Sequence, residues 1–168
     1  VDIVIASGDY FTVHDSDIAA MIKIIPGTPV YMEMHYTTLS GNDENGVYNW
    51  RRTTDNQFYT AAHLAYSRGA AGISTYNFQY YRPFGDGVSQ GPFSEPPFHI
   101  FNHMADKDWI ASQPQHYVLA ITWMTVEYTH TMPLKYTASG QTSTFEMDMA
   151  PPSGGWTTDG RLKIQAFA

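Results

Sequence analysis

The chain has 168 residues, of which 43% are apolar and only 15% are charged, and its net charge is −7. This length allows one ordinary domain or two small ones, and the absence of any Lys or Arg run excludes a nucleic-acid-binding footprint. No apolar run approaches the roughly 20 residues of a membrane span. The chain has no Cys, so it has no disulfide framework and no thiolate metal site.

These features lead us to expect no cofactor, no metal, no nucleic acid and no membrane association. The cellular compartment stays open, with a secreted or periplasmic location slightly favoured. Aromatic residues reach 15%, with 12 Tyr and 4 Trp. Low charge with many aromatics is typical of proteins that hold neutral polar ligands such as sugars, and equally of a buried interface. Both explanations remain open.

The first unit is a strand followed by a helix. Val1–Asp9 is a short apolar run that ends in small and acidic residues, which predicts a buried parallel strand. Asp15 and Ser16 offer an N-cap for a helix. Apolar residues then follow at helical spacing, at Ile18, Met21, Ile22 and Ile25. Pro26 and Gly27 end that helix.

The second unit begins with a predicted strand over Thr28–Tyr36. Alternate residues fall on opposite faces of a strand, so one face carries Val30, Met32, Met34 and Tyr36. The other face carries Tyr31, Glu33 and His35. A loop rich in turn-forming residues is expected over Thr37–Thr53.

A helix follows this loop. Thr54 and Gln57 form a capping box, which marks the start of a helix. Its apolar stripe is formed by Phe58, Ala61, Ala62 and Ala65. Gly69 stands where a C-terminal cap belongs.

The third unit is predicted as a strand over Ile73–Tyr81 and two helices over Phe98–Met104 and Asp106–Ser112. The alternation of strands and helices is the signature of βαβ units on a parallel sheet. We therefore predict an α/β fold over residues 1–114.

The pattern changes after Pro114. Four short β-like runs with turns between them predict a small β-sandwich-like region over residues 115–168. About 50 residues bury only a modest core. We therefore expect this region to lean on the first part of the chain through Trp123 and Trp156.

Three βα units do not close a barrel, which needs eight units and about 250 residues. We therefore expect either that the chain is a piece of a larger protein or that another chain supplies the missing strands. Open sheet edges at Val1–Asp9 and Ile73–Tyr81 would otherwise stay exposed. A homodimer or a higher assembly is predicted to cover them.

The segments "GAAGISTYNFQYYR" and "EPPFHIFNHMADKDWIASQPQHYVL" carry a resemblance to a known family. They resemble the end of the barrel in a bacterial family of glycoside-hydrolase-like proteins with a family 10-type β/α barrel, followed by a β-rich domain. The resemblance implies that this chain is the C-terminal part of such a protein: a partial barrel of about three βα units and a trailing β-rich region. It implies a hydrolase that acts on an oligo- or polysaccharide. The alternative is a non-catalytic carbohydrate-binding or assembly protein built on a barrel fragment.

Glu33 is the first catalytic candidate. Active-site residues of β/α barrels lie at the carboxyl ends of strands, and Glu33 lies near the end of the second predicted strand. Asp9 ends the first predicted strand and is the second candidate. Glycoside hydrolysis needs two carboxylates. The alternatives are a Glu33 held by a neighbouring cation and an Asp9 that caps the following turn.

Six further residues are candidates for substrate binding. Tyr31 and His35 share the predicted face of Glu33, and Asn77 lies in the third predicted strand, from which its amide would bond either a sugar hydroxyl or the backbone. Sugar rings stack on exposed aromatics, which favours Trp50 and Tyr81. Both residues are adjacent in sequence to arginines at loop ends. Arg82, one of these arginines, is the sixth candidate for substrate binding.

Overall fold

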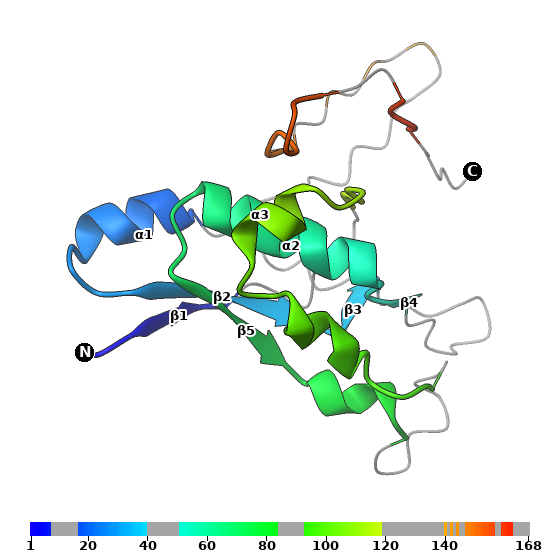
Figure 1. Cartoon of the computed structure of the whole chain (residues 1–168), viewed down its shortest axis with the longest axis horizontal. Helices are drawn as coiled ribbons and strands as arrows, with labels where there is room; N and C mark the ends of the chain where they lie inside the picture. Colours follow the sequence, from blue (N-terminus) through cyan, green and yellow to red (C-terminus); the bar gives the residue numbers. More distant parts are fainter. Residues whose placement is uncertain are drawn as a thin grey trace.

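A computed structural model describes residues 1–7, 17–39, 51–83, 93–118, 140, 142, 144, 147–156 and 159–162. The predictions made for Asp9, Asp15, Ser16, Trp50 and Trp123 lie outside these residues. Figure 1 shows the elements, which follow one another as β1 (Val4–Ala6), α1 (Ile18–Ile24), β2 (Val30–His35), β3 (Thr37–Leu39), β4 (Arg51–Arg52), α2 (Asp55–Ser67), β5 (Gly72–Tyr76), the 3-10 helices η1 (Phe78–Tyr81) and η3 (Phe98–Asn102), and α3 (Lys107–Ala111).

Within the described residues, the main sheet has three parallel strands in the order β1-β2-β5. Its register pairs Val4 with Val30 and Glu33 with Ser74. This arrangement confirms the predicted mixed α/β fold with a parallel sheet. The chain then leaves this sheet, because β3 pairs with β4 in a separate antiparallel pair. The prediction of a loop over all of Thr37–Thr53 is therefore wrong at both of its ends.

Burial along β2 alternates as predicted from Val30 to Met34, and both His35 and Tyr36 after it are buried. Val30, Met32 and Met34 are buried in the core. Tyr31 and Glu33 on the other face are only partly buried. Both α1 and α2 contact β2, and Figure 1 shows the helices lying to one side of the sheet. The apolar face of β2 is therefore the one that the helices cover.

The N-cap of α1 lies one residue after Ser16, the later of the two predicted caps. Asp17 is its N-cap, and the Asp17 carboxylate accepts from the Ala20 N–H at 2.9 Å. Ile18 is fully buried, and Met21, Ile22 and Ile25 pack against the core. The predicted apolar spacing is thus confirmed. The cap prediction failed because three acceptor-bearing residues stand in a row, and each is a good N-cap.

Helix α2 begins with the predicted capping box, in which the Gln57 side-chain oxygen accepts from the Thr54 N–H at 2.8 Å. Gly69 follows the helix with a φ of 95°, the left-handed conformation expected at this position. Burial extends well beyond the predicted stripe, to Tyr59, Thr60 and Leu64. A second layer of chain must therefore cover the outer side of α2.

Strand β5 ends at Tyr76, so the predicted strand over Ile73–Tyr81 is wrong in its second half. Asn77 has a φ of 52°, and this left-handed turn redirects the chain into η1. Residues three apart eclipse in a 3-10 helix, and this spacing buries Phe78 and Tyr81 together. The aromatic run resembled a strand in sequence, but its burial follows a period of three.

The two helices predicted after the third strand are shorter than expected. The first is the 3-10 helix η3, over Phe98–Asn102, and the second is α3, over Lys107–Ala111. In α3 the Asp106 side chain caps the Trp109 N–H at 3.0 Å. Helix α3 packs on α2, so it adds to the layer that covers one side of the sheet.

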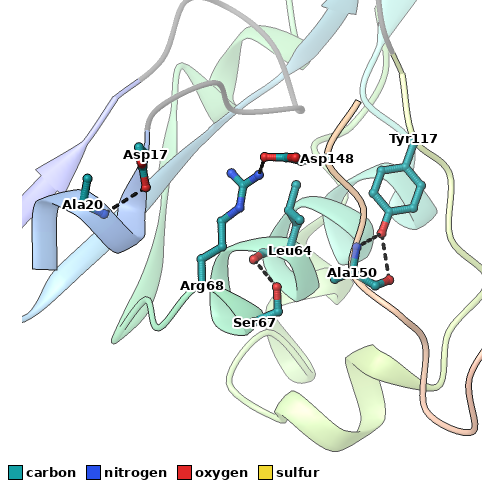
Figure 2. A network of polar contacts seen from close by, with 8 residues as sticks. All are labelled: Asp17, Ala20, Leu64, Ser67, Arg68, Tyr117, Asp148 and Ala150. Atoms are coloured by element: carbon teal, nitrogen blue, oxygen red, sulfur yellow. Dashed lines mark hydrogen bonds and ion pairs between the residues drawn. The ribbon is translucent and has the colours of Figure 1, made fainter. Parts of the chain in front are cut away.

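The region after Pro114 shows no strand among its described residues, so the predicted sandwich is not observed there. Residues 147–155, here called the strap, lie against α2 and α3. Figure 2 shows Arg68, the C-cap residue of α2, paired with Asp148, and the Tyr117 hydroxyl bonded to Ala150. The Ser153 N–H donates to the Ala111 carbonyl at 2.8 Å.

The strap forms part of the second layer over α2, together with α3. His63 of α2 lies 2.8 Å from the Pro151 carbonyl, and Ala150 is buried. Trp156, in contrast, is 57% exposed. The prediction that Trp156 anchors the C-terminal region is therefore wrong. Among the described residues, hydrogen bonds and the small buried residue Ala150 make this contact.

Candidate functional site

The sheet face opposite α1 and α2 is here called the open face. Among the described residues it carries Ile5, Ser7, Tyr31, Glu33, His35, Gly72, Ser74 and Tyr76, because alternation and register place their side chains on one side. Ile5 is 47% exposed and Tyr76 is 41% exposed. The open face thus exposes apolar and aromatic surface beside a single carboxylate.

The carboxylate of Glu33 lies at the centre of this face. The Ser7 hydroxyl, just beyond β1, donates to Glu33 Oε1 at 2.5 Å. His35 Nε2 lies 4.0 Å from the same oxygen. The Glu33 side chain is 15% exposed, so a ligand on the open face can reach a carboxylate that Ser7 holds in one orientation.

His35 is the last residue of β2, and its side chain is buried. Its imidazole packs on the Tyr76 ring with a centroid distance of 5.0 Å. Register pairs these two residues across β2 and β5. His35 is therefore enclosed between Glu33 on its own strand and Tyr76 on the next.

Tyr31 lies at the other end of the face, where register pairs it with Gly72. A Cβ atom added at Gly72 would lie 2.2 Å from Tyr31 Cε1. The Tyr31 ring therefore fills the space that a side chain at position 72 would occupy. Glycine at this position lets the ring lie across β5, with Glu33 two residues further along β2.

A polar cluster closes the carboxyl end of β2. The Thr53 hydroxyl donates to the His35 carbonyl at 2.8 Å, and the Thr53 N–H donates to the Tyr36 carbonyl at 2.9 Å. The Tyr81 hydroxyl donates to the Thr53 carbonyl at 2.6 Å. The guanidinium carbon of Arg52 lies 5.0 Å from the Tyr36 ring centroid and 5.7 Å from that of Tyr81, within the range of cation–π attraction.

Burial dominates the electrostatics of this cluster. It lowers the pKa of the Arg52 guanidinium, although the nearby Tyr36 and Tyr81 counteract part of that effect. It raises the pKa of the Tyr81 phenol well above its ordinary value. Tyr81 therefore stays protonated and remains a hydrogen-bond donor to Thr53 at neutral pH.

The structure brings three of the predicted site residues together on the open face: Tyr31, Glu33 and His35. Three others lie elsewhere. Tyr81 is buried in the core, where its ring has no face for a sugar. Asn77 forms the left-handed turn after β5, and Arg82 is an exposed residue paired with Glu95. Asp9 and Trp50 lie outside the described residues.

Sequence reasoning missed Ser7, Ser74 and Thr53. Ser7 and Ser74 become neighbours of Glu33 only through the strand register, which a single sequence does not determine. The signal that was present is that Ser7 lies two residues from Ile5, on the same side of an extended chain. Thr53 was assigned to a loop, and nothing in its local pattern marks it as a bonding partner of β2.

The described residues contain no group of three His, Asp or Glu side chains arranged to hold a metal ion. Within the same residues, no helix is long and apolar enough to cross a membrane. Comparison with protein-family models, with curated proteins and with solved structures found no match.

Proposed function

We propose that this chain is part of a glycoside hydrolase that acts on an oligo- or polysaccharide, with Glu33 as one of its two catalytic carboxylates. The observation that carries the proposal is the position of Glu33. It lies late in a parallel strand, on the face opposite the helices. In a β/α barrel, helices cover the outside, and catalytic groups lie at the carboxyl ends of the strands. The described sheet is, on this proposal, a segment of such a barrel.

Hydrolysis of a glycosidic bond requires a second carboxyl group opposite the first. One group protonates the leaving oxygen, while the other attacks the sugar or activates water. We assign the second role to Asp9, which follows Ser7 by two residues in the sequence, or to a carboxylate from another chain. Ser7 acts as a positioning residue, since its hydroxyl holds the Glu33 carboxylate.

The residues around Glu33 favour a neutral sugar as the substrate. Tyr31 and Tyr76 flank Glu33 along the open face, and Ser74 lies beside it on β5. Among the described residues of this face there is no Lys or Arg to bind an anionic sugar. Aromatic rings and hydroxyl groups suit the apolar faces and the hydroxyl edges of neutral pyranose rings.

One observation favours a second candidate, a non-catalytic carbohydrate-binding protein. The contacts described for the Glu33 carboxylate are with a hydroxyl and an imidazole. Neither group is the second carboxylate that hydrolysis needs. On this alternative, Glu33 accepts hydrogen bonds from sugar hydroxyls and does no chemistry.

Replacing Glu33 with Gln separates the two candidates, because it preserves shape and removes charge. The assay measures reducing-end release from cellulose, xylan, mannan and soluble oligosaccharides, with binding to the same sugars measured in parallel. A hydrolase loses at least about 100-fold in cleavage rate while binding is nearly retained. The matched control is Glu95→Gln, which changes an exposed glutamate paired with Arg82 and should leave cleavage intact.

Two results would decide against the hydrolase. If neither the wild type nor the variant cleaves but both bind, the binding protein is the correct function. If the wild type cleaves and Glu33→Gln cleaves equally well, the assignment of Glu33 is wrong.

A further inference from the structure

Strand β2 ends at the point where the chain passes from the parallel sheet into the β3–β4 pair. Thr53, directly after β4, bonds both residues at this junction. Its hydroxyl donates to the His35 carbonyl and its N–H donates to the Tyr36 carbonyl, at 2.8 and 2.9 Å. Thr53 therefore fixes the backbone at the last residue of β2 and at the residue after it.

Thr53 is itself held in place. It is buried, and its carbonyl accepts from the Tyr81 hydroxyl at 2.6 Å. All three of its polar groups thus take part in hydrogen bonds. The stacked Arg52 and Tyr81 side chains adjoin it on the β4 side. Because Thr53 is bonded at three points, it links the end of β2 to η1 and β4.

The His35 side chain extends from the stretch of backbone that Thr53 bonds. The imidazole is buried, with Nε2 4.0 Å from Glu33 Oε1 and its ring 5.0 Å from Tyr76. We propose that Thr53 is a positioning residue that holds His35 against Glu33. The inference rests on the proposed function only for the role of Glu33, because the position of His35 can be measured without any sugar.

The perturbation that isolates this role is Thr53→Val, which keeps the shape and removes the hydroxyl. The buried His35 carbonyl then loses its side-chain donor, and the end of β2 is free to shift. Thr53→Ser restores the hydroxyl and should restore the wild-type behaviour. Tyr81→Phe removes the bond that holds Thr53 and should have a smaller effect in the same direction.

The readout is the NMR titration of the His35 imidazole, assigned by comparison with a His35→Gln variant. Glu33 and Tyr76 are titratable groups that face this ring. We expect Thr53→Val to move the titration midpoint away from the wild-type value. In a cleavage assay, the same variant should change the pH profile of kcat and lower kcat by up to about 100-fold.

Thr60 provides a matched control, because it is an equally buried threonine in α2. Its hydroxyl donates to the Asn56 carbonyl at 2.6 Å and accepts from the His116 N–H at 2.7 Å. Thr60→Val should reduce stability and leave the His35 titration unchanged. The proposal is overturned if Thr53→Val moves the titration no more than Thr60→Val does, or if Thr53→Ser fails to restore it. If Thr53→Val does not fold, the Ser and Phe variants decide the question.

The two proposals fail in different ways. If Thr53→Val shifts the His35 titration but the wild type cleaves no sugar, the hydrolase proposal is contradicted and the positioning role of Thr53 stands. A protein that loses cleavage with Glu33→Gln, but whose His35 does not respond to Thr53→Val, contradicts only the positioning role.

Discussion

Tyr81→Phe tests whether the cluster at the end of β2 is structural. The change removes one hydroxyl, which donates to the Thr53 carbonyl at 2.6 Å in a buried environment. Leaving a buried carbonyl without its hydrogen-bond donor lowers the free energy of unfolding by about 1–2 kcal/mol. We therefore expect urea denaturation at pH 8 to show the variant less stable than the wild type by that amount.

The same variant has a signature in alkaline solution. Burial raises the pKa of Tyr81 in the folded protein, whereas the unfolded chain releases this proton near pH 10. Above pH 10 the folded state therefore binds more protons than the unfolded state, and the wild type loses stability as the pH rises. This residue accounts for about 1.4 kcal/mol of that loss at pH 11. The variant lacks this ionisable hydroxyl, so the difference in the free energy of unfolding between the two proteins should shrink by the same amount.

Burial also raises the pKa values of Tyr59, Tyr66 and Tyr117. These residues are present in both proteins, so their effect cancels in the difference. A stability difference that does not change between pH 8 and pH 11 would show that burial does not raise the pKa of Tyr81 in the folded protein. If Tyr81→Phe instead weakens sugar binding at unchanged stability, Tyr81 contacts the ligand and its assignment to the core cluster is wrong.

Tyr117→Phe removes both hydrogen bonds to Ala150 and should lower the free energy of unfolding by about 1–3 kcal/mol in urea; unchanged stability would show that the strap does not depend on them. Gly72→Ala must displace the Tyr31 ring, so it should weaken binding of a neutral oligosaccharide. Tyr31 NMR signals identical to those of the wild type would show that the ring is not displaced. Both edge strands, β1 and β5, should be covered in an oligomer, which a compact monomer in sedimentation at micromolar concentration would contradict.

The sequence predicted those parts of the fold in which local chemistry and tertiary structure agree. Strand β2 alternates between large apolar residues and Tyr31, Glu33 and His35, so its two faces could be assigned in advance. The capping box of Thr54 and Gln57 marked the start of α2 without any long-range information. In both cases the residues that carry the signal are neighbours along the chain.

The predictions failed where distant contacts decide the structure. The aromatic run after Tyr76 has high strand propensity, but Phe78 and Tyr81 reach the core only because Asn77 turns the chain into a 3-10 helix. Local propensity is a weak guide when burial opposes it. Likewise, Ser7 and Thr53 are far from β2 in sequence, and only the fold brings them to Glu33 and His35.

The most direct test of the proposed catalytic role of Glu33 is a distance. It joins the Glu33 carboxylate to the nearest other carboxylate, measured in a crystal structure of the assembled protein with every chain counted. We expect a second carboxyl group across the open face, about 5–5.5 Å away for a retaining enzyme or about 6.5–9.5 Å away for an inverting one. Asp9 or an acidic residue of another chain should supply it. The absence of any carboxylate within about 10 Å of Glu33 would contradict the central claim that this glutamate is one of a catalytic pair.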